Sequence, residues 1–448
     1  MRKYTIRKGK PHVIGCNYTN GGAVLKRLSI WSALYLPHTG GVENFTRNAA
    51  DALAKRGVAV QVVTSQLGGS PEHEIEPNGV EVWRLPARPL MSGRLPVPQK
   101  GAQYKRLMGE IERFAPEAVL VNTRFYPHSA EGLKFAQRIG AKAAVLDHGS
   151  AHLVLGSSVL DAGLAAYEHA VTARAKSFHP QFFGISQKSA EWLTHFGINP
   201  TGIIQNAIDA PAFRAKASDR DFRAEFGIAP DDLLIAFCGR LVPEKGPDKL
   251  LEALTLLDEN VDVQEGGIAG IDDGGDAESA KASTVAGKAA AVVDLESFAG
   301  IKCIFAGDGP LREQLEAKAR EQAGNGAPCA FFPGNLDPAD LSALLQQANV
   351  FCLPTRSEGF CTSLLEASAC GVPSAITDVG GARELIPDAG VGFIVPDSRP
   401  ASIAATLRKA KGLGPAALAD MGKRAQRHVE EVSSWEQTAD AILAAFSI

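Results

Sequence analysis

Two glutamates lie eight positions apart in the stretch CLPTRSEGFCTSLLEASACG, which begins at Cys352. Glu358 follows an apolar run that predicts a strand, and Glu366 belongs to an apolar segment that predicts a helix. A helical rise of about 1.5 Å per residue separates the two carboxylates too widely for them to share a proton. We therefore expect them to contact different parts of one long ligand at the carboxyl edge of a sheet.

The helix that carries Glu366 also begins with unpaired main-chain donors. The N–H groups of Phe360, Cys361 and Thr362 precede or open this helix. Such groups lack helical acceptors, and the partial positive charge of a helix start attracts anionic oxygens. These three residues therefore join the candidate ligand site.

Two cations occupy an equivalent place in AFCGRLVPEKGPDKLLEAL. Arg240 ends an apolar run that predicts a strand, and Lys245 precedes a predicted helix, Asp248–Leu257. Arginine offers a fork of donors and lysine a point charge, and both suit the diphosphate of a leaving group. A pair of solvated surface charges is the alternative. The two cations follow the first predicted strand of the second half of the chain, and this position favours a ligand site.

The doublet Gly40–Gly41 likewise joins a predicted strand to a predicted helix, Val42–Arg56. Glycines let the main chain approach a ligand closely, and a new helix suits a phosphate. The doublet matches neither G-x-G-x-x-G nor the P-loop pattern, so taken alone it favours a plain tight turn.

Short apolar runs alternate with helical patterns along most of the 448 residues, which predicts an α/β fold with parallel sheets. This length exceeds what one core usually supports, so we expect two Rossmann-like halves, 28–205 and 206–432. A last helix, 433–448, is expected to pack back across their junction. The expected strands are Leu28–Tyr35, Ala59–Thr64, Glu81–Leu85, Ala118–Asn122, Ala143–Asp147, Phe182–Ile185, Leu233–Cys238, Ile301–Ala306, Ala330–Phe332, Val350–Leu353, Pro373–Ile376 and Gly392–Val395.

Two segments depart from this pattern. Residues 1–27 carry seven basic and no acidic side chains, which favours a solvated or disordered arm and leaves contact with anionic lipid open. Residues 258–300 hold ten acidic and two basic residues among many Gly, Ala and Ser. Such a segment buries too little apolar area to fold, so we expect a flexible insertion at the amino-terminal edge of a sheet, away from any site.

Charge, hydropathy and cysteine usage exclude several classes of protein. A net charge of −4 gives no reason to expect nucleic acid as a partner. No apolar run predicts a membrane span or a signal peptide. The seven cysteines are odd in number, lack C-x-x-C and show no zinc spacing, which is typical of reduced thiols in a cytoplasmic protein.

Taken in order, these motifs resemble the retaining GT-B glycosyltransferases of family 4. The resemblance rests on the Gly-Gly turn, GRLVPEKG, FAGDGPL, the stretch Phe331–Ile386 and a late SSWEQTA. Glu358 to Glu366 matches the E-x7-E motif of the family. The likeness covers nearly the whole chain except the first 25 or so residues and the 258–300 insertion. It implies a GT-B fold, in which two Rossmann-like domains face each other across a central cleft.

The resemblance also implies roles for the matching residues. Glu358 would face the donor sugar, and Glu366 would hold the ribose hydroxyls of the nucleotide. Arg240 and Lys245 would neutralise the diphosphate, over which Gly40–Gly41 would close from the other domain.

Further positions follow from the same resemblance. His148, in AVLDHGS at a strand end, would lie beside the anomeric carbon, although taken alone it favours a structural or a solvent-exposed histidine. Gly380–Gly381 would lie close to the nucleotide or sugar, and Phe332–Asp337 near the base. Cys361 departs from the glycine that many members carry, and a small thiol fits there if the contact is made through its N–H group.

The implied activity is transfer of a hexose-type sugar from a UDP or GDP sugar, with retention, to a lipid-linked, polysaccharide or small-molecule hydroxyl. No Asp-x-Asp motif stands in a metal-binding context, so we expect no metal or cofactor, with Arg240 and Lys245 in the place of a divalent ion. Under the usual scheme for retention, neither glutamate is an obligate nucleophile, unlike the carboxylate pair of glycoside hydrolases.

The location and the acceptor are less constrained. The basic start of the chain and the loop Met91–Tyr104 are compatible with a membrane-proximal acceptor and with a peripheral position of the protein at the inner face of the membrane. A soluble acceptor is the alternative.

Three other functions compete with this interpretation. An NAD-dependent dehydrogenase also pairs Rossmann domains, but G-x-G-x-x-G is missing. A GT-B-shaped sugar-nucleotide epimerase lacks this arrangement of E-x7-E. A catalytically silent nucleotide-sugar-binding or partner-binding module would not need His148, both cations and both glutamates.

Overall fold

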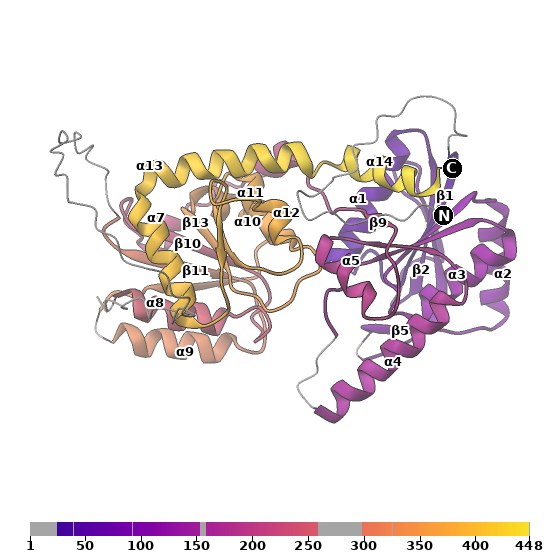
Figure 1. Ribbon diagram of the computed structural model, residues 1–448, viewed down its shortest axis with the longest axis horizontal. Coiled ribbons are helices and arrows are strands. Elements are labelled where there is room, and N and C mark those ends of the chain that lie inside the picture. Colours follow the sequence, from indigo (N-terminus) through magenta and orange to yellow (C-terminus); the bar gives the residue numbers. More distant parts are fainter. Residues whose placement is uncertain are drawn as a thin grey trace, which may run out of the picture.

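The computed structural model describes residues 25–38, 40–91, 93–152, 158–258, 298–324 and 326–447. They form two α/β domains that lie side by side, each built on a mostly or wholly parallel sheet (Figure 1). The predicted fold class is therefore confirmed. The predictions for residues 1–24 of the basic arm and 259–297 of the acidic insertion lie outside the described residues.

The amino-terminal domain contains a sheet in the order β3-β4-β2-β1-β6-β7-β8-β9, with β5 paired to β4. Its strands are parallel except for β3 and β5, which pair antiparallel with β4. The strands are β1 Arg27–Ser32, β2 Ala59–Gln66, β3 His73–Ile75, β4 Glu81–Leu90, β5 Leu95–Pro98, β6 Ala118–Asn122, β7 Lys142–Asp147, β8 Gln181–Gly184 and β9 Gly202–Ile203. The helices are α1 Gly41–Lys55, α2 Ala102–Arg113, α3 Pro127–Ile139, α4 Ser158–Lys176 and α5 Gln187–Thr194.

The carboxyl-terminal domain contains a parallel sheet in the order β12-β11-β10-β13-β14-β15. Its strands are β10 Leu233–Cys238, β11 Ile301–Ala306, β12 Ala330–Gly334, β13 Val350–Leu353, β14 Ser374–Thr377 and β15 Phe393–Val395. The helices that follow the first domain are α6 Ala210–Ala215, α7 Phe222–Phe226, α8 Pro247–Asp258, α9 Arg312–Ala323, α10 Pro338–Gln347, α11 Thr362–Ala369, α12 Ala382–Leu385, α13 Pro400–Val432 and α14 Trp435–Phe446.

The central strands of both sheets are apolar without alternation. All residues of β6, β10 and β13 are buried. Strands of a parallel sheet are covered by helices on both faces, so both of their faces must be apolar. Cys238 and Cys352, which belong to two of these strands, are buried free thiols, as their apolar surroundings in the sequence predict.

Both sheets have a topological switch point beside their first strand. In the carboxyl-terminal sheet, β10 lies between β11 and β13, and in the amino-terminal sheet β1 lies between β2 and β6. The connections leave such neighbouring strands in opposite directions, which opens a crevice at their carboxyl ends where ligands bind. Lys245 follows β10, Glu358 follows β13 and Gly41 follows β1, so the sequence places candidate residues at both switch points.

The chain crosses between the domains twice, and the two crossings are hydrogen-bonded to each other. In the first crossing, Ile208 N donates to the Ser433 carbonyl oxygen at 2.9 Å. In the second, Thr438 Oγ1 donates to the Gln205 carbonyl oxygen at 2.8 Å. The two crossings therefore form one joint between the domains.

The last helix of the chain belongs in space to the amino-terminal domain. Helix α13 ends at Val432, and α14 begins with a capping box of Ser434 and Gln437. Helix α14 then lies against α1, where Arg56 pairs with Asp440 (Figure 1).

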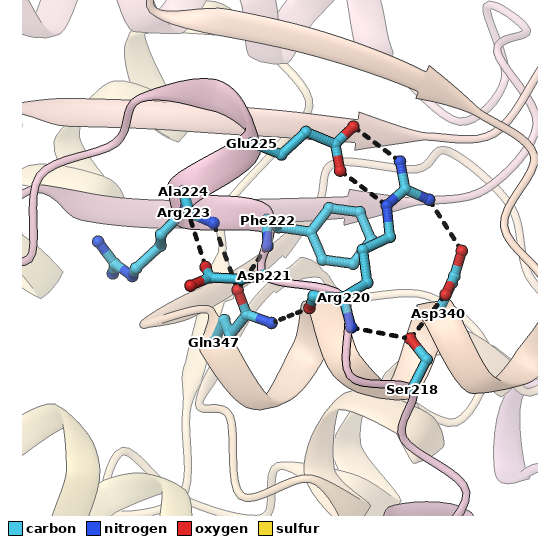
Figure 2. Close-up of polar contacts among 9 residues, drawn as sticks. All are labelled: Ser218, Arg220, Asp221, Phe222, Arg223, Ala224, Glu225, Asp340 and Gln347. Atoms are coloured by element: carbon cyan, nitrogen blue, oxygen red, sulfur yellow. Dashed lines mark hydrogen bonds and ion pairs between the residues drawn. The ribbon is translucent and has the colours of Figure 1, made fainter.

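A polar cluster anchors the segment after the first crossing to the carboxyl-terminal domain (Figure 2). Arg220 makes two hydrogen bonds to Glu225, at 2.8 and 2.9 Å, and a third to Asp340 of α10 at 2.8 Å. Its guanidinium carbon lies 4.5 Å from the centre of the Phe222 ring. Gln347 accepts from the Phe222 N–H group at 2.8 Å, so α10 holds this segment at both of its ends.

We expect Arg220→Ala to lower the free energy of unfolding at neutral pH by about 1–2 kcal/mol, because it removes a bidentate and a third charged contact at a half-exposed site. A hydrogen bond from Arg220 lowers the pKa of the Glu225 carboxyl group. Hydrogen bonds from Ser218 and Arg220 lower the pKa of the Asp340 carboxyl group. This stabilisation is therefore present at neutral pH and lost as the pH falls through the folded pKa values. Urea unfolding at pH 7 and pH 3 measures the effect.

Arg320→Ala is the matched control. Arg320 forms an ion pair with Glu316 at 3.5 Å, and its side chain is 76% exposed. We expect a change within about 0.5 kcal/mol. Equal effects of the two substitutions would contradict an anchoring role for Arg220.

Candidate functional site

Lys245 and Glu358 meet at the switch point of the carboxyl-terminal sheet. Lys245 Nζ donates to Glu358 Oε1, although the two residues lie 113 positions apart. The side chains are only 18% and 11% exposed. The structure thus brings together one cation and one carboxylate from two separate motifs.

The two loops that carry this pair are joined along their main chains. Arg356 N donates to the Glu244 carbonyl oxygen at 2.9 Å. Gly246 has a φ of 70°, and a Cβ there would lie 2.6 Å from the Pro354 carbonyl oxygen. Only glycine therefore fits between the loops at this position.

Arg240 lies in the same loop as Lys245, with an exposed side chain. Within the described residues, its guanidinium makes no hydrogen bond or ion pair to the protein. The FAGDGPL motif supports this loop, since Leu241 N donates to the Asp308 carbonyl oxygen at 2.9 Å. A Cβ at Gly309 would lie 2.6 Å from the Leu241 carbonyl oxygen, so the motif glycine permits the close approach.

Glu366 lies one turn into α11 and is only partly exposed. Its carboxylate has no hydrogen bond or ion pair to any residue that the structure describes. Burial alone raises its pKa to about 7. A half-buried carboxylate without a protein partner is suited to accept hydrogen bonds from a ligand's hydroxyl groups.

The start of α11 has an unusual main chain at Cys361, where φ is 80°. This left-handed conformation favours glycine over cysteine. The thiol is buried, and burial raises its pKa to about 12, so the group stays protonated. In the described part of the chain, the N–H groups of Phe360, Cys361 and Thr362 have no protein acceptor, which leaves them available to a ligand.

On the opposite domain, His148 follows β7. Its Nε2 lies 3.3 Å from Asn122 Oδ1, while Asn122 Nδ2 donates to Thr46 Oγ1 at 2.7 Å. Since the amide presents its oxygen, Nε2 carries the proton and Nδ1 keeps its lone pair. Burial lowers the pKa of His148 to about 3, so the ring is neutral at physiological pH.

The loops of His148 and Glu358 lie directly against each other across the domain interface. Ser150 Oγ donates to the Glu358 carbonyl oxygen, and Ser186 Oγ donates to that of Gly359 at 2.7 Å. A Cβ at Gly359 would lie 2.0 Å from the His148 carbonyl oxygen. The two domains therefore touch at the edge where their candidate residues lie.

Other contacts extend this interface. Asn206 Nδ2 lies 3.5 Å from Thr362 Oγ1, and a Cβ at Gly41 would lie 4.0 Å from the same hydroxyl. Lys188 pairs with Asp378 at 2.7 Å. The start of α1 thus faces the start of α11, as expected if both helices approach one anion.

The remaining expected positions are Gly380–Gly381 and the stretch Phe332–Asp337. A Cβ at Gly380 would lie 2.7 Å from the Glu358 carbonyl oxygen, so the Gly380–Gly381 turn packs under the Glu358 loop. Asp337 accepts from two N–H groups at the start of α10, at 2.9 Å each, so its side chain serves as a helix cap. Phe332 stacks on Phe305 with ring centres 5.1 Å apart.

We expect Gly359→Ala to push the domains apart, because the added methyl group clashes with main-chain atoms of the His148 loop. Turnover should fall about tenfold or more through misplacement of the two half-sites. Small-angle scattering and steady-state rates measure the two effects. Gly109→Ala on α2 is the control, since no atom lies within 4 Å of its Cβ position. An unchanged scattering profile with normal turnover would show that this contact does not govern the site.

Two family profiles match the sequence. "Glycosyltransferase Family 4" matches residues 39–210, and "Glycosyl transferases group 1" matches residues 275–428. The first profile covers the half with Gly40–Gly41 and His148, and the second covers the half with Glu358 and Glu366. The chain belongs to the family 4 glycosyltransferases.

Similar proteins agree with this assignment. A D-inositol 3-phosphate glycosyltransferase of Rhodococcus opacus is 26% identical over 419 residues, which cover 91% of this chain and 85% of the relative. A sucrose-phosphate synthase from Thermosynechococcus elongatus has a TM-score of 0.66 at 17% identity, covering 93% and 97% of the two chains. HepE of Anabaena, solved in complex with UDP, has a TM-score of 0.63 at 17% identity, covering 94% and 99%. These structures share the GT-B fold, and the predictions of a GT-B fold, of family 4 and of a glycosyltransferase are confirmed.

Sequence reasoning missed several residues of this glycosyltransferase. Ser150, Ser186 and Asn206 form contacts between the domains, and Asn122 orients His148. Asn122 ends a predicted strand next to the switch point, which is a usable signal. No described helix of the glycosyltransferase is both long and apolar enough to cross a membrane.

Proposed function

We propose that this glycosyltransferase moves a hexose-type sugar from a UDP or GDP sugar to an acceptor hydroxyl, with retention and without a metal ion. The observation that carries the proposal is the Lys245–Glu358 pair at the switch point, with Arg240 unpartnered within the described chain in the same loop.

Breaking the bond between the anomeric carbon and the phosphate oxygen leaves charge on the diphosphate. Lys245 and Arg240 are positioned to stabilise that charge, and the N–H groups at the start of α11 add donors. The acceptor oxygen forms the new bond to the anomeric carbon, and its proton passes to the departing phosphate oxygen. This balance needs neither a covalent intermediate on a glutamate nor a cofactor.

Glu358 serves two purposes in this scheme. Its Oε1 accepts from Lys245, which holds the ammonium group in place before the diphosphate arrives. The other oxygen remains able to accept from a sugar hydroxyl. Glu358 is therefore a positioning and electrostatic group.

His148 is suited to the sugar side of the site. A neutral imidazole whose Nε2 proton points to Asn122 presents an uncharged ring atom to a developing oxocarbenium ion. Repulsion by an imidazolium would oppose that charge, so the lowered pKa favours the reaction.

The acceptor is the part of the proposal that rests on the relatives. They carry the name D-inositol 3-phosphate glycosyltransferase, which makes a phosphorylated cyclitol a candidate small-molecule acceptor. Lipid-linked and polysaccharide acceptors remain on the same panel.

A donor panel tests the proposal. UDP and GDP sugars are incubated with the purified protein and each acceptor, and release of the nucleoside diphosphate is measured with and without a chelator. We expect release with one donor, a product of retained configuration, and turnover that persists with the chelator. Binding of a donor without release would instead indicate a silent module, and an epimerised donor would indicate an epimerase.

A further inference from the structure

Three histidines of the amino-terminal domain converge from three different elements. His152 follows β7, His169 lies on α4 and His195 ends α5. One nitrogen of each ring lies within 4.8 Å of the others. In the part of the chain that the structure describes, no other group of three or more His, Cys, Asp or Glu side chains is arranged to hold a metal ion.

The closest pair has the spacing of metal ligands. His152 Nε2 lies 3.3 Å from His195 Nε2. Two nitrogens bound to one tetrahedral zinc ion at 2.0–2.1 Å are separated by about 3.3 Å. His169 and His195 are exposed, so rotation of their side chains can bring the third nitrogen to the same distance.

A buried carboxylate orients the first of these rings. Glu168 Oε2 lies 2.5 Å from His152 Nδ1, and the Glu168 side chain is only 6% exposed. Nδ1–H donates to this carboxylate, so the lone pair of Nε2 faces the other two histidines. Metal-ligating histidines are held in this way by a carboxylate on their outer nitrogen.

The carboxylate is itself fixed from the interior of the domain. Arg124 Nη2 donates to Glu168 Oε1 at 2.7 Å, and Arg124 Nε lies 3.4 Å from Asp147 Oδ2. Asp147 directly precedes His148 in the chain. The histidine cluster is thus connected through buried charges to the loop that faces Glu358.

Ring stacking offers a competing explanation. Trp192 and His195 are stacked with centres 4.7 Å apart, and His152 meets Trp192 edge-on at 4.8 Å. Stacking accounts for the ring planes of His195 and Trp192. It does not require three nitrogens to converge, or a carboxylate to hold the outer nitrogen of His152.

We propose that His152, His169 and His195 bind one divalent transition metal ion of the zinc class, with water in the fourth position. Imidazole nitrogens suit zinc, copper and nickel, whereas magnesium and calcium prefer oxygen. The ion ties α4 and α5 to the loop after β7. The ion is a structural clamp on the His148 loop and lies outside the proposed donor site. The proposal of a metal site therefore does not depend on the proposed function.

Zinc binding to the chelator-treated full chain tests the site. Calorimetric titration with zinc chloride should give one ion per chain and raise the melting temperature. His169→Asn should weaken affinity about a hundredfold, and Glu168→Gln about tenfold through loss of orientation. Cobalt should give a visible absorption band of a four-coordinate ion, which His169→Asn abolishes.

His179→Asn is the matched control. His179 is exposed, lies outside the cluster and has a φ of 55°, which asparagine also accepts. Its zinc affinity should equal that of the unaltered chain. No zinc binding above the level of His169→Asn, or equal loss of affinity in His179→Asn, would overturn the proposal. If His169→Asn unfolds, the cobalt spectrum of the unaltered chain decides, because stacking alone gives no such band.

Discussion

Lys245→Ala should lower turnover by about a thousandfold while the carboxyl-terminal domain stays folded. The substitution removes a cation aimed at the departing diphosphate. It also leaves Glu358, only 11% exposed, without its partner, so a negative charge faces the leaving group. Steady-state rates with the donor identified by the panel measure the loss, and circular dichroism reports the fold.

Substitution of Glu358, the partner of Lys245, tests the same assignment of the donor site. Glu358→Gln keeps an acceptor oxygen but removes the charge that holds Lys245, so we expect a loss of about a hundredfold. The double variant Lys245→Ala, Glu358→Gln should lose less than the product of the single losses, because the two side chains act as one pair. Independent effects would contradict that coupling.

Lys249→Ala controls for the loss of any lysine near the site. Lys249 lies on α8 and pairs with Glu252 at 3.3 Å, with 41% of its side chain exposed. Its turnover should match that of the unaltered enzyme. Near-normal rates in Lys245→Ala and Glu358→Gln would remove both residues from the catalytic machinery.

The fold could be predicted because most strands are buried on both faces. A strand such as β13, VFCL, is apolar throughout and has a predicted counterpart with the same bounds. Strands β3, β5 and β9 were not predicted, because they are two to four residues long and all their residues except Pro96 are exposed or only partly buried. The strand predicted over Leu28–Tyr35 ends at Ser32, where the chain turns toward Gly40.

The position of the site could be predicted, but its internal contacts could not. Arg240, Lys245 and Glu358 follow neighbouring strands of one parallel sheet, and this topology alone places them at one edge. The ion pair of Lys245 with Glu358 depends on side-chain packing across 113 positions. Serines such as Ser150 occur in any loop, so no pattern marks their contact with the opposite domain.

The histidine cluster is a second arrangement that sequence patterns could not predict. His152, His169 and His195 are separated by 17 and 26 positions, which match no metal-binding motif. They converge only because α4 and α5 bring His169 and His195 to ring centres 5.2 Å apart. Sequence spacing predicted no metal site, and the tertiary structure supplies the reason for proposing one.

Glu366→Gln should change the pH dependence of donor binding. Burial raises the pKa of Glu366 to about 7, so the unliganded side chain passes from mostly protonated to mostly ionised between pH 6 and 8. Only the ionised form accepts two ribose hydroxyls without offering a proton. Donor affinity of the unaltered enzyme should therefore rise about tenfold from pH 6 to 8 relative to Glu366→Gln. Calorimetry with a nucleotide sugar measures this, since its diphosphate has no proton to lose in that range.

The stability of the unliganded protein should move in the opposite direction. Because the folded pKa of Glu366 lies above its unfolded value, the folded state binds the proton more tightly, and stability falls as the pH rises toward and through about 7. Glu366→Gln has no such proton, so its melting temperature should exceed that of the unaltered chain at pH 8, and the difference should vanish only below about pH 4, where the side chain is protonated in both the folded and the unfolded state. The ionised Glu366 carboxylate would thus lower the stability of the unliganded protein and strengthen donor binding. This combination would indicate that the carboxylate serves the ligand and not the fold. Parallel pH profiles for the two proteins, in both measurements, would show that Glu366 titrates normally and leave its place at the ribose unsupported.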